Sequence, residues 1–187
     1  MPSQTWLDQQ VEGYDYLKVN SFKLSLLNLP HVSFYCQTAN LPGLDLGIAM
    51  QPTPLMDLAL AGEKMQHEDL QVQFVIDAKL QNWTELFNWI IALGRKDSQQ
   101  EFIDLRHSGK NKSLSRNFTP LNEESGIYAD ATLMLLTGKS NPYAIINLTD
   151  IFPVRLSGIP FDATQTETEY MMAHATFKFK NYNIEVL

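Results

Sequence analysis

The feature that most constrains this chain is a strand followed at once by a helix, over residues 68–94. The strand is apolar at every second position, in the order Leu70, Val72, Phe74 and Ile76. This period of two is typical of a half-buried strand. From residue 82 to residue 94 the apolar side chains recur at helical spacing instead, over a wide face. Such a strand beside one strongly apolar helix predicts a helix that lies against a sheet.

The helix carries its own start and stop signals. Asn82 is a good N-cap, and Glu85 lies three residues on, as in a capping box. Gly94 is well placed to end the helix. Trp83 and Trp89 are interpreted as core anchors, in preference to a pair that stacks on a ligand.

Strand patterns fill most of the remaining chain. Residues 21–39 predict a hairpin that turns at residues 28–31, and Gly62 predicts a further turn. Pro153 marks its strand as an edge strand or a bulge. The other predicted strands cover residues 44–50, 57–61, 131–136, 143–149, 151–158 and 170–182. The chain is therefore predicted to be a mostly β, α+β protein with one helix.

Two polar segments interrupt this pattern. Residues 1–20 are predicted to form an N-terminal arm, and residues 95–129 a long polar loop. No internal repeat or boundary divides the chain, so residues 1–187 are predicted to form a single domain. The length of 187 residues and the apolar fraction of 44% suffice for one packed core.

Composition argues against several classes of protein. The net charge of −7 is unfavourable for general nucleic-acid binding, which needs clustered Lys and Arg. The single cysteine, Cys36, excludes an intrachain disulfide and a cysteine-rich zinc site. No apolar run reaches the roughly 18–20 residues that span a bilayer, and the N-terminus lacks a signal-peptide pattern. We expect no membrane association, and folding in the compartment where the chain is made.

The chemical inventory is small. None of the four histidines has a metal-ligand spacing, and no motif of a catalytic or cofactor site is found. Cys36 alternates with Phe34 on an apolar face, which favours a small buried residue over a nucleophile. We therefore expect no enzyme, no metal and no cofactor. An unrecognised hydrolase would need carboxylates that meet only in space, such as Asp77 and Glu85.

A local basic run lies inside the long polar loop. It consists of Arg106, Lys110, Lys112 and Arg116. Two interpretations stay open. Such a run usually belongs to a solvated loop. The more specific interpretation is a contact for an acidic partner or a neighbouring ring.

A strand-rich domain without an active-site pattern favours a binding or assembly protein. The edges of an antiparallel sheet expose unpaired main-chain groups. If the sheets of neighbouring copies join, these edges become interfaces, and a ring of identical chains is one way to close such contacts.

Three segments resemble the tail tube protein family of contractile-tailed bacteriophages. The first is Val32-Ser-Phe-Tyr-Cys-Gln-Thr-Ala-Asn-Leu-Pro-Gly43, a strand that runs into Leu-Pro-Gly. The second, residues 68–90, places the pattern Asp-Leu-x-Val-x-Phe-x-Ile-Asp before a helix that holds Asn-Trp and Asn-Trp-Ile. The third joins Phe152-Pro-Val-Arg-Leu-Ser-Gly-Ile159 to the closing strand Ala173-His-Ala-Thr-Phe-Lys-Phe179.

The resemblance implies two packed antiparallel sheets, which form a β-barrel or sandwich flanked by the helix at about residues 82–94. It implies hexameric rings that stack into a tube inside the contractile sheath and join the baseplate hub. DNA would pass through the lumen without specific binding, and an acidic lumen would repel it. The protein would then be a structural component of the virion, assembled in the host cytoplasm.

Alternatives remain at two levels. Within the family, the elaborated segments 95–129 and 131–149 leave open whether the chain forms the tube or the first ring that joins it to the baseplate. From another class, a small-ligand-binding β-barrel of the lipocalin type would also fit an apolar interior.

The resemblance also implies which residues meet neighbouring copies. If the hairpin 131–149 and the last strand line the ring, Thr132, Asn147, Thr176 and Lys178 are candidates for lumen or interface contacts. A slip of one residue would move each of these side chains to the opposite face of its sheet.

Overall fold

The computed structural model describes residues 21–27, 29–94, 128–137, 140–161 and 170–187. The predicted N-terminal arm and nearly all of the predicted polar loop lie outside these residues. Within them the chain forms nine strands and two helices. In chain order these are β1 (Phe22–Leu26), α1 (Pro30–Tyr35), β2 (Cys36–Ala39), β3 (Leu44–Pro52), β4 (Asp57–His67), β5 (Leu70–Val75), α2 (Gln81–Gly94), β6 (Ala129–Leu136), β7 (Pro142–Leu156), β8 (Met172–Lys178) and β9 (Asn181–Val186).

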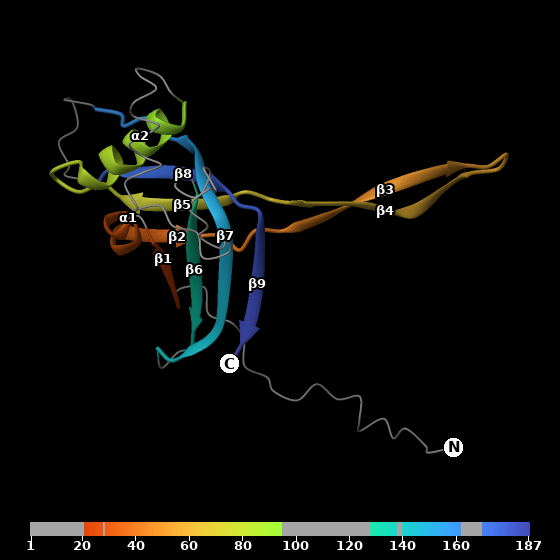
Figure 1. The fold of residues 1–187 in the computed structure, drawn as a ribbon, viewed down its shortest axis with the longest axis horizontal. Helices are drawn as coiled ribbons and strands as arrows, with labels where there is room; N and C mark the ends of the chain where they lie inside the picture. Colours follow the sequence, from red (N-terminus) through yellow and green to blue (C-terminus); the bar gives the residue numbers. More distant parts are fainter. Residues whose placement is uncertain (1–20, 28, 95–127, 138–139, 162–169) are drawn as a thin grey trace, which may run out of the picture.

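The strands build two antiparallel sheets and a separate hairpin. Sheet A has the order β1-β6-β7-β9, and sheet B the order β7-β8-β5-β2, so that β7 belongs to both. Strands β3 and β4 pair with each other. In Figure 1 the strands of sheet A run across the direction of β2, β5 and β8. The predicted packing of two sheets is confirmed as a sandwich, and over the described residues it does not close into a barrel.

Strand β7 joins the sheets by bending at one residue. Its first half pairs with β6 and β9, and its second half pairs with β8. Asp150, between the halves, is buried and has a φ of 55°, in the left-handed region. Its backbone N–H donates to Asp130 Oδ1 at 3.2 Å. The predicted strands 143–149 and 151–158 are therefore one strand, and the bulge predicted at Pro153 is confirmed by a register shift just after it.

The core lies between the two sheets. The alternation predicted for β5 is confirmed, since Leu70, Val72 and Phe74 are buried and the residues between them are less so. Their direct partners on β8, which are Phe177, Ala175 and Ala173, are buried as well. Sheet A contributes the buried side chains of Leu24, Leu133 and Ile146 to the same cluster.

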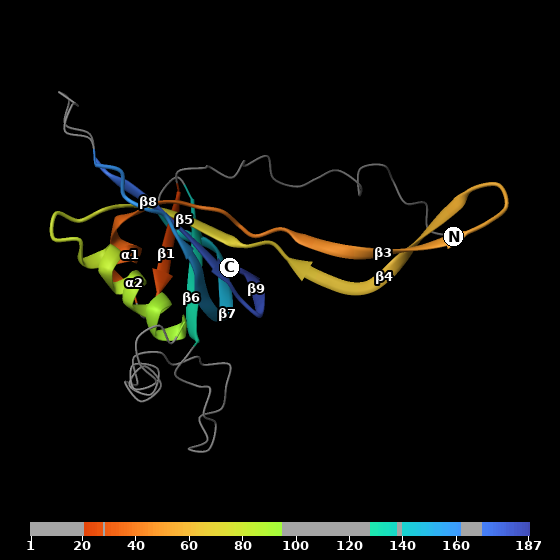
Figure 2. The same ribbon diagram turned by 90° about the horizontal axis from the view of Figure 1, so that it is seen from above.

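Helix α2 closes one end of this core, as Figures 1 and 2 show. It contacts β7 and α1, and it buries Leu86 and Trp89. Trp83 packs against the core, and its indole N–H donates to Ser157 O at 3.2 Å. The interpretation of both tryptophans as core anchors is confirmed, and the described part of the helix runs to Gly94.

The start of α2 differs from the prediction. The helix begins at Gln81, so Asn82 is not its N-cap. Asn82 is fully buried, and its Nδ2 donates to Val75 O at 2.8 Å. Its Oδ1 accepts the backbone N–H of Asp77 at 3.3 Å. The side chain therefore links α2 to the end of β5. At this buried position the amide bonds the main chain of another element instead of capping the helix.

The predicted hairpin over residues 21–39 is wrong. Strand β1 pairs with β6 and β2 pairs with β5, and α1 lies between them, so the chain has a second helix. Pro30 starts this helix, at a position where a missing backbone N–H has no cost. Ser33 Oγ accepts the N–H of Leu26 at 2.8 Å, where the hairpin would have supplied a strand partner.

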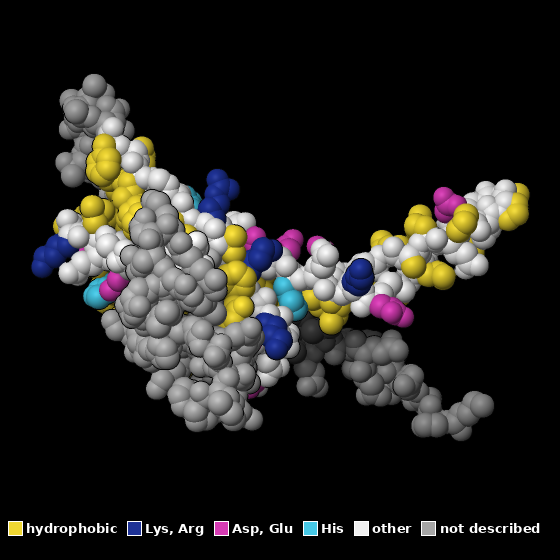
Figure 3. All heavy atoms as spheres, turned by 45° about the horizontal axis from the view of Figure 1, so that its top comes forward, with side chains coloured by type: hydrophobic (Ala, Val, Ile, Leu, Met, Phe, Trp, Pro, Cys, Tyr) yellow, Lys and Arg dark blue, Asp and Glu magenta, His cyan; other side chains and the backbone are white. Residues whose placement is uncertain are grey.

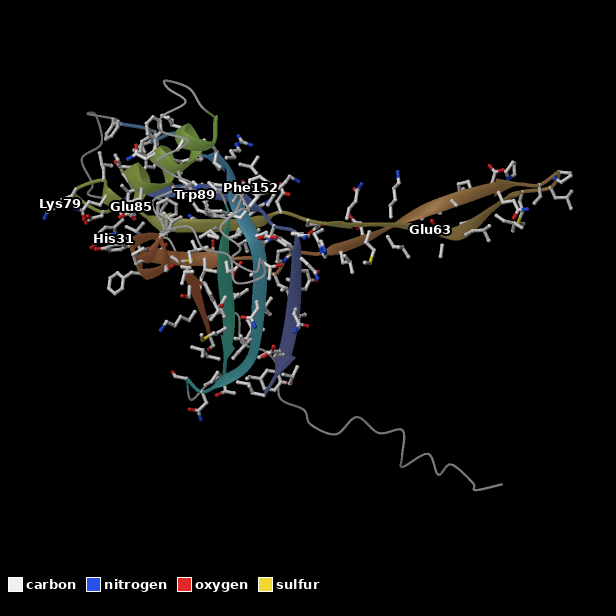
Figure 4. The ribbon with its side chains drawn as sticks, viewed as in Figure 1. His31, Glu63, Lys79, Glu85, Trp89 and Phe152 are labelled. Atoms are coloured by element: carbon white, nitrogen blue, oxygen red, sulfur yellow. The ribbon has the colours of Figure 1, made fainter. Side chains whose placement is uncertain are left out.

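Three further predictions are corrected. Glu85 forms no capping box, because its Oε1 lies 2.8 Å from Nδ1 of His31 on α1 (Figure 4). Gly62 lies inside β4 and not in a turn. The predicted strand 170–182 divides into β8 and β9, because the chain crosses there from sheet B to sheet A.

Replacing Asn82 with alanine is expected to lower the free energy of unfolding by about 2–3 kcal/mol, because Val75 O and the Asp77 N–H lose a buried partner. Urea unfolding followed by tryptophan fluorescence measures the change. Gln81→Ala, at the exposed neighbouring position, is the control and should cost less than about 0.5 kcal/mol. Equal losses in the two variants would contradict the role given to Asn82.

Candidate assembly surfaces

The outward face of sheet A carries a row of neutral polar side chains. Ser25, Thr132, Asn147 and Asn183 stand opposite one another on four adjacent strands. Thr132 Oγ1 donates to Asn147 Oδ1 at 3.2 Å. Two of the residues predicted to face a lumen or an interface are therefore in direct contact.

The other two predicted residues lie on sheet B. Thr176 stands opposite Gln71 on the outward face, and Lys178 Nζ pairs with Asp69 Oδ1 at 2.8 Å. The structure thus brings Thr132 and Asn147 together on sheet A and places Thr176 and Lys178 on one strand of sheet B. Their contact with neighbouring copies stays a prediction.

The remaining predicted site is the basic run. Arg106, Lys110, Lys112 and Arg116 lie outside the described residues, so their role as a partner contact also stays a prediction. Among the residues that the structure describes, no group of three or more His, Cys, Asp or Glu side chains is placed to hold a metal ion. None of the helices in the described ranges is long and apolar enough to cross a membrane.

Sheet A ends in two open edges. Strands β1 and β9 are its outermost strands, and each has a neighbour on one side within the described part of the chain. The free side of such a strand is a template for another strand, since its main-chain N–H and C=O groups point outward unpaired.

The most exposed element among the described residues was not predicted as a unit. It is the β3–β4 hairpin, Leu44–His67, here called the arm, which projects away from both sheets in Figures 1 and 2. Apolar side chains lie along it (Figure 3), and Ile48 is 70% exposed. The exposed large apolar residues of the arm are Leu44, Leu46, Ile48, Met50, Leu55, Met56, Leu58, Leu60 and Met65. Apolar surface on this scale marks an interaction site.

Both faces of the arm are apolar. The register sets Ile48 opposite Ala61 on one face and Ala49 opposite Leu60 on the other. A hairpin of two strands is at best marginally stable in water by itself. The arm can therefore offer either face, or both, to a partner that covers it.

Two glycines let the arm strands approach closely near its base. A Cβ atom on Gly62 would stand 2.4 Å from Gly47 O, so no other residue fits there. The register also shifts between Leu46 and Ile48, as in a bulge, which increases the local twist. This close approach explains why Gly62 occurs inside a strand. Two glycines at matching distances from the turn are the signal by which the sequence could have revealed one long hairpin.

Burial governs the chemistry of the cysteine. Desolvation raises the pKa of the Cys36 thiol to about 11, so the thiol stays protonated at neutral pH. Cys36 also packs against the core cluster. Both observations agree with its interpretation as a packing residue.

No family model matches the sequence, and no curated protein matches it by sequence. Solved structures do match. A chain of the sheath–tube complex of the extracellular contractile injection system PVC aligns with a TM-score of 0.59 and 16% identity, over 99% of this chain and 100% of that one. The tube-terminating cap of the anti-feeding prophage gives a TM-score of 0.62 and 12% identity, over 100% of both chains. A chain of the anti-feeding prophage baseplate gives 0.58 and 14%, over 93% and 97%.

This chain has the tail-tube fold. The alignments run over nearly the whole of each chain, so the resemblance carried by three short segments is confirmed at the level of the fold. The tail-tube fold accounts for the two sheets, and it leaves the arm and the sheet edges as the features from which a function has to be argued.

Cys36 is expected to react with a thiol reagent about 100-fold more slowly in the folded chain than in the unfolded chain at pH 8, because burial lowers the thiolate fraction. Absorbance with Ellman's reagent measures the rate in the folded chain. The same assay in about 8 M urea measures the rate in the unfolded chain. Cys36→Ser gives the background. Equal rates would show that the thiol is not protected. Because the thiol ionises at a lower pH in the unfolded chain, ionisation of Cys36 lowers the free energy of unfolding as the pH rises towards 11.

Proposed function

We propose that this chain is a structural subunit of the tube of a contractile tail or injection system, without enzymatic activity. The observation that carries the proposal is the arm, whose apolar side chains lie exposed on a body that has the tail-tube fold. A monomer gains nothing from this surface, whereas an assembly can remove it from water.

The open edges of sheet A supply the second contact. We propose that β1 of one copy meets β9 of the next, so that the sheets of neighbouring copies join into a ring. This contact uses two different surfaces, and such contacts form closed rings when the rotation from copy to copy fits. The family resemblance sets the number at six copies.

The arm is proposed to reach a neighbouring copy, where rings stack into a tube. Full burial of one Leu, Ile or Met side chain contributes about 1.5–3 kcal/mol. Several such side chains on each arm therefore provide a strong driving force for stacking, even if burial is partial.

The outward face of sheet A is proposed to line the lumen. Besides its neutral polar row, the charged side chains of this face on the described strands are Lys23, Asp130 and Glu185. A wall of this kind would let DNA or another cargo pass without specific binding. This face contributes little to the repulsion predicted for an acidic lumen, because its described strands carry one cation and two carboxylates.

The expected partners are the contractile sheath outside the tube and the baseplate hub at its end. The protein would lie in the tail of a phage or phage-derived particle, assembled in the host cytoplasm. Its similar structures include a sheath–tube complex, a tube cap and a baseplate, so the tube and the first ring at the baseplate are both retained as roles. No observation favours the ligand-binding barrel, because over the described residues the sheets do not close and their facing side chains form the core.

The purified full-length chain is expected to form six-membered rings or hollow tubes in negative-stain electron microscopy. Light scattering on the same sample should give about six chains per ring, the number that the proposal requires. Tubes of indefinite length would favour the tube over the first ring. A chain that stays monomeric at high concentration and binds a small apolar ligand would support the alternative barrel instead.

Ile48→Asp is expected to abolish stacking while it changes the free energy of unfolding by less than about 0.5 kcal/mol, because Ile48 is 70% exposed in the single chain. Electron microscopy measures the tubes, and urea unfolding the stability. Gln51→Asp adds the same charge at an exposed polar position of the same strand and serves as the control. Unchanged tubes in Ile48→Asp would contradict the proposed role of the arm.

A further inference from the structure

The rows of side chains across sheet A connect its two open edges. One row runs through Lys23, Met134, Ile145 and Glu185, from β1 across β6 and β7 to β9. A cation therefore stands at one edge and a carboxylate at the other, at the same height and on the same face. Both side chains are exposed.

From this row we propose that Lys23 of one copy pairs with Glu185 of the next, and that this ion pair sets the register of the joint between β1 and β9. The inference rests on the proposed function, in which the two edges meet. It adds which residues meet and in which alignment.

The direction of the two strands allows the joint. Each step from β1 to β6, β7 and β9 is antiparallel. Three reversals leave β1 and β9 antiparallel to each other. Joining β9 of one copy to β1 of the next therefore continues the antiparallel order of sheet A without a break.

The main-chain groups at the β1 edge restrict the alignment. Leu136 N–H donates to Ser21 O at 2.8 Å, and Leu27 N–H donates to Asp130 O at 3.2 Å. Odd-numbered residues of β1 therefore turn their main-chain groups towards β6. The main-chain groups of Phe22, Leu24 and Leu26 point to the open edge instead. The Leu26 N–H already donates to Ser33 Oγ there.

The same reasoning applies to β9. Leu187 N–H donates to Tyr143 O at 2.9 Å, so odd-numbered residues of β9 turn their main-chain groups towards β7. Ile184 and Val186 turn theirs to the open edge. Only even-numbered residues of the two strands can therefore form hydrogen-bonded pairs across the joint.

The alignment that continues the row satisfies this parity and both side-chain faces. It pairs Leu24 with Ile184 and Phe22 with Val186 by hydrogen bonds, and it covers the apolar side chains of Ile184 and Val186, which are 47% and 66% exposed in the single chain. Lys23 and Glu185 then form the non-hydrogen-bonded pair between them, in which side chains approach most closely.

Other alignments fit less well. A slip of one residue breaks the parity and sets Glu185 opposite Phe22 or Leu24, whose side chains lie on the core face. A slip of two residues, which a tilted barrel can require, keeps the parity and leaves Lys23 diagonal to Glu185, still within reach of two long side chains. The ion pair is thus retained in direct register and after a slip of two residues.

Charge reversal tests the pair in the full-length chain. Lys23→Glu and Glu185→Lys are each expected to raise the concentration needed for ring formation at least about tenfold, because like charges would meet at every joint. The double variant restores the pair in reverse and is expected to form rings like the wild type. Lys79→Glu, at an exposed position far from sheet A (Figure 4), controls for the change in net charge.

A disulfide maps the alignment independently. Lys23→Cys with Glu185→Cys is expected to give chains linked to one another on oxidation, since directly opposed strand residues suit disulfide geometry. Lys23→Cys with Asn183→Cys reports the alignment shifted by two residues.

The outcomes separate the two proposals. The ion pair would be overturned, and the ring retained, if the wild type forms rings and both single reversals form them equally well. The same conclusion would follow if the double variant does not recover ring formation. Rings without a linked product from either cysteine pair would overturn the alignment. A wild-type chain that never forms rings would overturn the proposed ring and the pair together.

Discussion

The fold depends on one strand that serves two sheets. Strand β7 continues through Asp150, which is held in the left-handed region by burial and by the hydrogen bond from its N–H to Asp130. A non-glycine residue in that region costs on the order of 1–2 kcal/mol, so the surrounding structure has to impose it. Because the bend is fixed, the direction of sheet A relative to sheet B is fixed too. The core between the sheets and the two free edges of sheet A follow from that geometry.

The molecule combines a packed apolar interior with a periphery that exposes strand edges and apolar side chains. Inside, apolar residues of both sheets and of α2 form one cluster, and the buried Asn82 amide has its partners. Outside, β1 and β9 have no outer neighbour among the described strands, and the arm presents apolar side chains on both faces. Exposed edges and apolar strands are normally aggregation hazards. In the proposed tube both become specific contacts, because identical copies offer the matching surfaces in a repeated geometry.

Particular residues show where prediction from sequence succeeded and failed. The alternation of β5 and the helical period after it were predicted correctly, because their burial involves neighbours close in sequence. Val32, Phe34 and Cys36 also alternate, but they form one turn of α1 and its exit, since six residues fit either period. Asn82 has the chemistry of an N-cap and is used as a buried tie instead. Thr132 and Asn147 meet because a hairpin places them opposite each other, and their contact with a lumen or a neighbouring copy stays a prediction.

The sequence by itself determined which segments avoid water on one side, that one helix anchors the core, and that no familiar active-site motif is present. It could not determine what covers each apolar face. The alternation over residues 44–50 equals that over residues 70–76, yet the first lies exposed on the arm and the second in the core. Periodicity shows that one side of a strand is apolar, and it does not show what lies against that side. Only the tertiary structure decided this, together with the sheet to which each strand belongs and the residues that meet at its edges, because those depend on pairing between segments far apart in sequence.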